Sequence, residues 1–124
     1  MKSNILTENS SSTKKAIKFL QSGKLVALKT ETVYGIACDP SSIIAIKKLY
    51  ELKNRPLYNP LIIHVNSTQL AAKISYIDRD SKLIMKNFWP GPLTLILKKK
   101  KNKLIYDFAT AGLDSIALRI PKSK

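Results

Sequence analysis

The feature that most constrains the fold is an alternation of short apolar runs with segments of helical periodicity. The run "LVAL" at 25–28 follows the first helical segment directly and predicts a strand buried on both faces. Further strands are predicted at 61–65 ("LIIHV"), 93–97 ("LTLIL") and 115–120 ("SIALRI").

Capping residues and prolines set the expected helix boundaries. The helices are expected from Ser12 or Thr13 to Gly23, from an Asp39 cap and Pro40 to about Lys53, over about 67–74, and from Asp78 or Asp80 to Phe88. The tetrapeptide "WPGP" at 89–92 stops the last of them. No G-x-G-x-x-G loop or regular crossover spacing is present. The pattern therefore predicts an α/β domain with a mixed sheet and flanking helices.

Composition favours one soluble domain. The 124 residues, 44% apolar, suit a single domain at 12–124 that follows a flexible N-terminus at 1–11. No apolar run approaches the roughly 20 residues that cross a bilayer, and the polar start lacks a signal-peptide segment, so we expect a cytoplasmic protein without membrane contact. Cys38, the only cysteine, is expected to be a buried structural thiol.

The charge balance is strongly basic. A net charge of +14 makes anionic partners plausible, although compositional bias explains a lysine-rich surface equally well. The 22 cations comprise 19 lysines and three arginines, Arg55, Arg79 and Arg119. Because a guanidinium offers bidentate geometry that lysine lacks, each arginine needs an explanation. The lysine-rich run at 98–103 is read as an exposed turn after a strand, with nucleic-acid contact as the alternative.

Three short patterns carry possible chemistry. Lys53 and Arg55, in the extended chain before Pro56, would point the same way and suit a polyphosphate, unless they only complement the preceding helix end. His64, the only histidine, is either a hydrogen-bonded core residue or a substrate ligand. One cysteine and one histidine cannot build the usual metal cluster, and no local signature of a catalytic triad is present. The stretch "KTETVYGIACDP" at 29–40 follows a predicted strand and is rich in hydroxyl side chains. These hydroxyls serve either a turn or a bound ligand.

Four blocks in order and spacing, "KTETVYGIACDP", "ELKNRPLYNPLIIHV", "FWPGPLTLIL" and "LDSIALRIPKS", resemble the YrdC family of threonylcarbamoyl-AMP synthases over about residues 12–124. The resemblance implies a twisted mixed sheet and synthesis of threonylcarbamoyl-AMP and diphosphate from ATP, L-threonine and bicarbonate or CO2. The product would serve N6-threonylcarbamoyladenosine formation in tRNA through a downstream transferase complex. Mg2+ would accompany ATP.

The resemblance also assigns residues. Thr32, His64 and Arg119 are similar to the family's threonine-binding positions, with Thr30 and Tyr34 shaping that pocket. Lys53 and Arg55 match the K-x-R pair that acts in catalysis and, with Asn59 and Ser115, binds ATP. The chemistry implied needs no protein nucleophile: a threonine carbamate attacks the α-phosphorus of ATP, so catalysis reduces to alignment and charge stabilisation.

Two departures from the family pattern stand out. Lys29 replaces a proline that often precedes the T-x-T-V-Y-G stretch. The sequence stops at Lys124, before the family's S-x-N motif, so the resemblance implies an incomplete nucleotide site and uncovered sheet edges. One alternative is an inactive fragment of the enzyme. The other, motivated by the +14 charge and the lysine run, is a module that binds double-stranded RNA or tRNA, whose affinity would fall steeply with salt.

Overall fold

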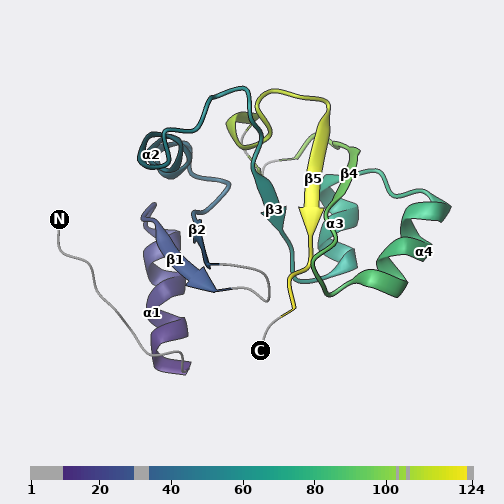
Figure 1. The fold of residues 1–124 in the computed structure, drawn as a ribbon, viewed down its shortest axis with the longest axis horizontal. Helices are drawn as coiled ribbons and strands as arrows, with labels where there is room; N and C mark the ends of the chain where they lie inside the picture. Colours follow the sequence, from purple (N-terminus) through teal and green to yellow (C-terminus); the bar gives the residue numbers. More distant parts are fainter. Residues whose placement is uncertain (1–9, 30–33, 103, 106, 123–124) are drawn as a thin grey trace.

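The computed structural model describes residues 10–29, 34–102, 104–105 and 107–122, with the backbone alone at Ser10, Tyr34 and Phe108. Figure 1 shows the elements in chain order. They are α1 (Ser10–Gln21), β1 (Val26–Lys29), β2 (Tyr34–Ala37), α2 (Ile43–Leu52), β3 (Ile62–His64), α3 (Thr68–Ile74), α4 (Arg79–Phe88), β4 (Leu95–Lys98), the 3-10 helix η1 (Asp107–Thr110) and β5 (Ser115–Arg119). Within these ranges no helix is long and apolar enough to cross a bilayer.

Helix α1 and the hairpin β1–β2 form one end of the molecule (Figure 1). The helix ends where predicted, because Gly23 adopts φ +80° and Lys24 N donates to Phe19 O at 2.9 Å. It begins at Ser10, so the cap predicted at Ser12 or Thr13 is wrong: both residues lie inside the first turn.

Strand β1 differs from the prediction of a strand buried on both faces. Its side chains alternate between half-buried and exposed, because β1 pairs with β2 alone among the described strands. Strand β2 was not predicted. The register runs from Val26 opposite Ala37 to Lys29 opposite Tyr34.

Helix α2 is capped by Ser42, whose Oγ accepts from Ala45 N at 3.2 Å. The predicted Asp39 cap is therefore wrong. The Asp39 carboxylate instead accepts from Ser41 N at 2.9 Å and Ser41 Oγ at 2.7 Å, which organises the turn before the helix. Lys53 is the C-cap, as the predicted helix end required.

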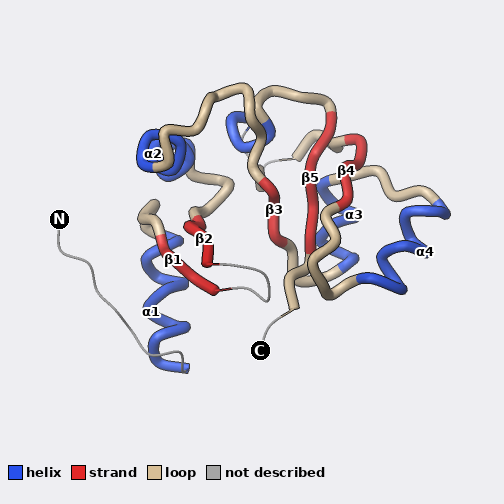
Figure 2. The backbone as a smooth tube through the Cα atoms, viewed as in Figure 1, coloured by secondary structure: helices blue, strands red, loops and turns tan. Residues whose placement is uncertain are grey.

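The central sheet has three strands in the order β3-β5-β4, with β3 parallel and β4 antiparallel to β5. The predicted mixed sheet is confirmed. Helices α3 and α4 begin at the N-caps Ser67 and Asp78, within the predicted ranges, and lie with β4 on the far side from the hairpin (Figures 1 and 2). Figure 2 shows the two groups of strands joined through the loops around α2.

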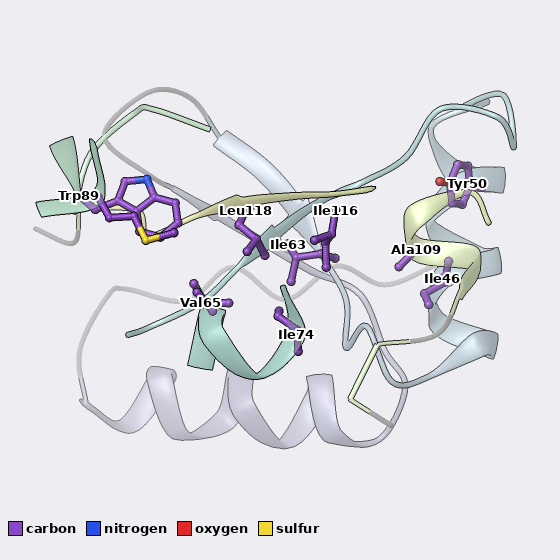
Figure 3. Close-up of a cluster of buried hydrophobic side chains, with 11 residues drawn as sticks. Ile46, Tyr50, Ile63, Val65, Ile74, Trp89, Ala109, Ile116 and Leu118 are labelled. Carbon is purple, nitrogen blue, oxygen red and sulfur yellow. The ribbon is translucent and has the colours of Figure 1, made fainter. Parts of the chain in front are cut away.

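Alternation along the strands sends one face of the central sheet into the core. Ile63, Ile116 and Leu118 are buried on that face and gather with Ile74 of α3 (Figure 3). Trp89 closes one end of the cluster, and its Nε1 donates to Leu93 O at 2.8 Å. Half-buried Cys38 packs against the same cluster.

The opposite face of the sheet is more open. Ile62 on β3 is 51% exposed and Ile96 on β4 is 73% exposed. Register places Ile62 and Ile96 on either side of Ala117 of β5. This face therefore also carries Ser115, two residues earlier on β5, and His64, two residues later on β3.

The lysine run is only partly the exposed turn that was predicted. Lys98 is the last residue of β4. Lys99 is largely covered, and its Nζ lies 3.1 Å from Asp107 Oδ1 and 2.8 Å from Thr110 Oγ1. Lys99 thus fastens η1 to the end of β4, while Lys103 lies outside the described residues.

Candidate functional site

The loop between α2 and β3 carries the paired cations, but the chain there is not continuously extended. Lys53 has φ −90° and ψ 0°, and Asn54 adopts φ +48°. Because two-residue alternation applies only to extended chain, the argument that Lys53 and Arg55 point the same way is wrong. Lys53 is exposed at the end of α2, where its charge also complements the helix dipole.

Arg55 is held by the backbone of its own loop. Its Nε donates to Asn59 O at 3.3 Å and its Nη2 donates to Pro60 O at 2.7 Å. A guanidinium has five N–H donors, so these two bonds fix its plane and leave three N–H groups that they do not use. Arg55 is half-buried, so its guanidinium is held in one orientation at the surface instead of moving freely.

Tyr50 supports the same loop from beneath. Its hydroxyl donates to Asn59 O at 2.6 Å, while Asn59 N donates to Pro56 O at 3.0 Å. Burial raises the pKa of Tyr50, and the neighbouring Arg55 charge opposes that rise. The Asn59 carbonyl is therefore the point where Tyr50 and Arg55 meet; the ATP contact predicted for Asn59 stays a prediction.

His64 and Arg119 are brought together at the other end of the parallel ladder. They are register partners on β3 and β5. Arg119 is only 7% exposed, and its Nε donates to Gly91 O at 2.8 Å. His64 is exposed, so its interpretation as a buried core residue is wrong, whereas its substrate role stays a prediction.

Ser115 lies at the start of β5, far from Arg119. Four residue steps along a strand correspond to about 13 Å. At this end, continuing the Ile62–Ala117 register leads toward Pro60, whose carbonyl receives Arg55. The structure thus sorts the predicted residues into two groups: Arg55, Asn59 and Ser115 toward one end of the ladder, and His64 with Arg119 at the other.

The hydroxyl-rich stretch after β1 is mostly outside the described residues. Thr30 and Thr32 are not described, and Tyr34 is described by its backbone alone, as the first residue of β2. The predicted threonine pocket therefore stays a prediction on that side. Lys29, the departure from the family pattern, ends β1 opposite Tyr34.

Comparison with known proteins decides the family. The family model Sua5_yciO_yrdC, described as "Telomere recombination", matches residues 18–124. The chain belongs to the Sua5/YciO/YrdC family. This confirms the resemblance drawn from the four sequence blocks.

Curated members of the family are similar over most of the chain. Threonylcarbamoyl-AMP synthase of Pyrococcus abyssi is 44% identical over 107 residues, which cover 86% of this chain and 31% of that protein. The Bacillus subtilis protein of the same name is 41% identical and covers 94% and 34% respectively. The chain thus spans about a third of the length of these relatives.

A solved structure of the family agrees with the fold. Pyrococcus abyssi Sua5 complexed with L-threonine superposes with a TM-score of 0.88 at 38% identity, over 95% of this chain and 34% of that one. The twisted mixed-sheet fold predicted from the Sua5/YciO/YrdC resemblance is therefore confirmed for the part of the domain that this chain contains.

A small depression lies beside His64 on the core side of β3. It has a volume of about 160 Å³ and is lined mainly by apolar side chains, including Pro40, Leu70 and Leu104. A zwitterionic amino acid needs convergent polar groups, which this lining does not supply. We therefore do not assign the depression as the threonine site of this Sua5/YciO/YrdC domain.

Two residues of the site region were missed as functional supports. Gly91 was read only as part of a helix stop, yet its carbonyl accepts from Arg119 and its N–H donates to Ile120 O at 2.9 Å. Tyr50 was not singled out from the sequence, although its hydroxyl fastens the Arg55 loop. The prolines flanking both loops were the one available signal, because they mark rigid turns without naming their partners.

Proposed function

We propose that this chain carries the substrate-aligning part of a threonylcarbamoyl-AMP synthase, which converts ATP, L-threonine and bicarbonate or CO2 to threonylcarbamoyl-AMP and diphosphate. The observation that carries the proposal is the pre-oriented Arg55 fork, in a domain 44% and 41% identical to two proteins of that name. That the chain is catalytically active by itself is part of this proposal.

On the phosphate side, Arg55 and Lys53 would bind the triphosphate. Fixing the guanidinium on two carbonyls beforehand lowers the ordering cost of binding, and the N–H groups outside those two bonds suit phosphate oxygens. Lys53 would add a mobile point charge that follows the departing diphosphate. Ser115, at the same end of the sheet, would contact the nucleotide.

On the threonine side, Thr32, His64 and Arg119 would hold the amino acid, with Thr30 and Tyr34 shaping the pocket. Arg119 donates through Nε to Gly91 O, so its guanidinium is held in a fixed position from which it would meet the threonine carboxylate. The carbamate formed on the threonine amine would then attack the α-phosphorus while diphosphate leaves, so the protein contributes alignment and charge stabilisation.

Mg2+ would enter with the triphosphate. Among the described residues no group of three or more His, Cys, Asp or Glu side chains could hold a metal ion. Mg2+ prefers phosphate oxygens and water over a cage made entirely of protein groups, which fits such a surface. A cytoplasmic location and delivery of the product to a tRNA-modifying transferase complex complete the proposal.

The test is to incubate the chain with ATP, threonine, bicarbonate and Mg2+ and to measure threonylcarbamoyl-AMP and diphosphate. Replacing Arg55 by Ala should weaken ATP binding by about tenfold or more, because hydrogen bonds to charged groups contribute roughly 1.5–3 kcal/mol. Arg79→Ala is the matched control, since Arg79 is exposed on α4. Equal losses of ATP affinity and thermal stability in Arg55→Ala would favour a purely structural arginine.

A second candidate function is binding of duplex RNA or tRNA, which the +14 charge favours. Phosphate contacts make such binding steeply dependent on salt. Titration with duplex RNA and with tRNA at two salt concentrations tests it. Flat, negligible binding to both would reject this function.

A further inference from the structure

Tyr76 stands at the outer edge of the central sheet, just after α3. Its side chain is 55% exposed. Its backbone is fixed: Tyr76 N donates to Lys98 O at 2.9 Å, and the preceding Ser75 forms an isolated bridge with Lys99. The ring therefore projects from fixed backbone at the surface instead of from a free loop.

The ammonium groups of two lysines lie over this ring. The Nζ of Lys98 lies 5.8 Å and the Nζ of Lys100 lies 5.1 Å from the ring centroid of Tyr76. Lys100 Nζ also donates to Ala72 O at 2.9 Å, so it is anchored at the end of α3. Lys99 between them turns to Asp107 and Thr110 instead. The lysine run is thus sorted by side, with alternate residues directed to the aromatic ring.

This arrangement has features that plain solvation does not require. A solvated lysine face needs no exposed aromatic ring, and a ring alone needs no cations within 6 Å. Together they match one unit of a polynucleotide: a base that takes the place of the ammonium groups over the ring, and phosphates on both sides of that base to which those groups turn. A mononucleotide has phosphates on one side of its base only.

We propose that Tyr76, Lys98 and Lys100 form a binding platform for single-stranded RNA, with one base stacked on Tyr76 and the adjoining phosphates at the two lysines. Bases inside a duplex are stacked on each other and cannot reach a protein ring, so duplex RNA does not use this platform. An acidic polypeptide would bind the two lysines but would have no base to stack on Tyr76. The proposal does not depend on the proposed synthase reaction, because the assay below contains neither ATP nor threonine.

The experiment measures fluorescence anisotropy of a labelled ten-nucleotide oligouridylate at several salt concentrations. Tyr76→Ala should lower affinity by about tenfold, whereas Tyr76→Phe should keep it, because stacking needs the ring and not the hydroxyl. The double variant Lys98→Gln/Lys100→Gln should reduce the slope of log affinity against log salt by about 1.4, at about 0.7 for each phosphate contact.

Matched controls come from α4. Phe88→Ala removes another exposed aromatic ring, and Lys82→Gln/Lys86→Gln removes two exposed charges from that helix. Phe88→Ala should leave the affinity unchanged, and the α4 double lysine variant should leave the slope unchanged. Circular dichroism melts of the variants at Tyr76, Phe88 and α4 should coincide with that of the wild type, because those side chains are exposed. The melt of Lys98→Gln/Lys100→Gln reports separately on loss of the bond from half-buried Lys100 to Ala72 O.

Four outcomes would overturn the platform. They are unchanged oligouridylate affinity in Tyr76→Ala, an equal loss in Phe88→Ala, a Tyr76-dependent affinity for duplex RNA equal to that for the single strand, and binding of polyglutamate that depends on the same three residues. A fifth outcome, from a separate ATP titration, would also overturn it: loss of ATP affinity in Tyr76→Ala would assign the ring to the mononucleotide. If the chain lacks synthase activity but binds oligouridylate as expected, only the proposed enzymatic function fails.

Discussion

Arg55 and Arg119 each bind the backbone of a loop, in two different regions of the molecule. Each donates from its Nε to a backbone carbonyl of a proline-rich loop, Asn59 O for Arg55 and Gly91 O for Arg119. The Arg55 bond spans four residues of chain and the Arg119 bond spans 28. Arg55 is half-buried at the surface, whereas Arg119 is buried.

The difference separates a local device from a tertiary one. If Arg55 is lost, its loop keeps the Tyr50 hydroxyl and its own turn hydrogen bonds. If Arg119 is lost, the "WPGP" loop loses a buried bond that joins it to β5. We therefore expect Arg119 to matter more for stability and Arg55 more for ligand binding.

The largest expected effect is that of Arg119→Ala. It leaves the Gly91 carbonyl without its charged donor in a buried setting and should lower the free energy of unfolding by about 2–3 kcal/mol. Urea denaturation measures the loss, with exposed Arg79→Ala as control within about 0.5 kcal/mol. A loss no larger than that of Arg55→Ala would remove the contrast between the two arginines.

Gly91→Ala tests the same "WPGP" loop by changing Gly91, whose carbonyl accepts from Arg119. An added Cβ would lie 2.6 Å from Phe88 O, so the backbone must shift, at a cost of about 1–3 kcal/mol. Gly35→Ala is the matched control, because its Cβ would meet no atom within 4 Å. Thermal melts of the two variants should differ clearly; coinciding melts would mean that the "WPGP" loop adapts freely.

Tyr50→Phe sharpens the comparison on the Arg55 side. It removes the 2.6 Å bond to Asn59 O and should lower the free energy of unfolding by about 1 kcal/mol. ATP affinity, measured by calorimetry, should fall a few-fold because the carbonyl that holds Arg55 loosens. Unchanged affinity would show that Arg55 fixes the loop without help from Tyr50.

The last effect, absent at neutral pH, concerns half-buried Cys38 near Tyr50. Burial, aided by the Asp39 charge, raises the pKa of Cys38 to about 11 from 9.0. The folded thiol therefore keeps its proton where the unfolded chain loses it, so its contribution to stability is present below pH 9 and is lost as pH rises to about 11. Wild type and Cys38→Ala should converge in urea midpoint over that interval; parallel curves would contradict the raised pKa.

Sequence reasoning worked where the signal was local. The termination of α1 at Gly23, the ranges of α3 and α4, and the strands around His64 and Ser115 followed from caps and apolar runs. It failed where neighbours decide. The run at 25–28 contains no polar residue, yet β1 is half exposed because β2 is its only described partner. Ser42 displaced Asp39 as cap because Asp39 turned its carboxylate to Ser41.

The sequence by itself determined the family, the α/β class and the two loops that carry arginines, because these depend on local pattern and on motifs in order. Only the tertiary structure decided what each guanidinium contacts, that His64 is exposed beside Arg119, and that Lys98 and Lys100 share the Tyr76 ring. Those contacts join segments up to 55 residues apart, and strand register, which no single residue encodes, sets which of them meet.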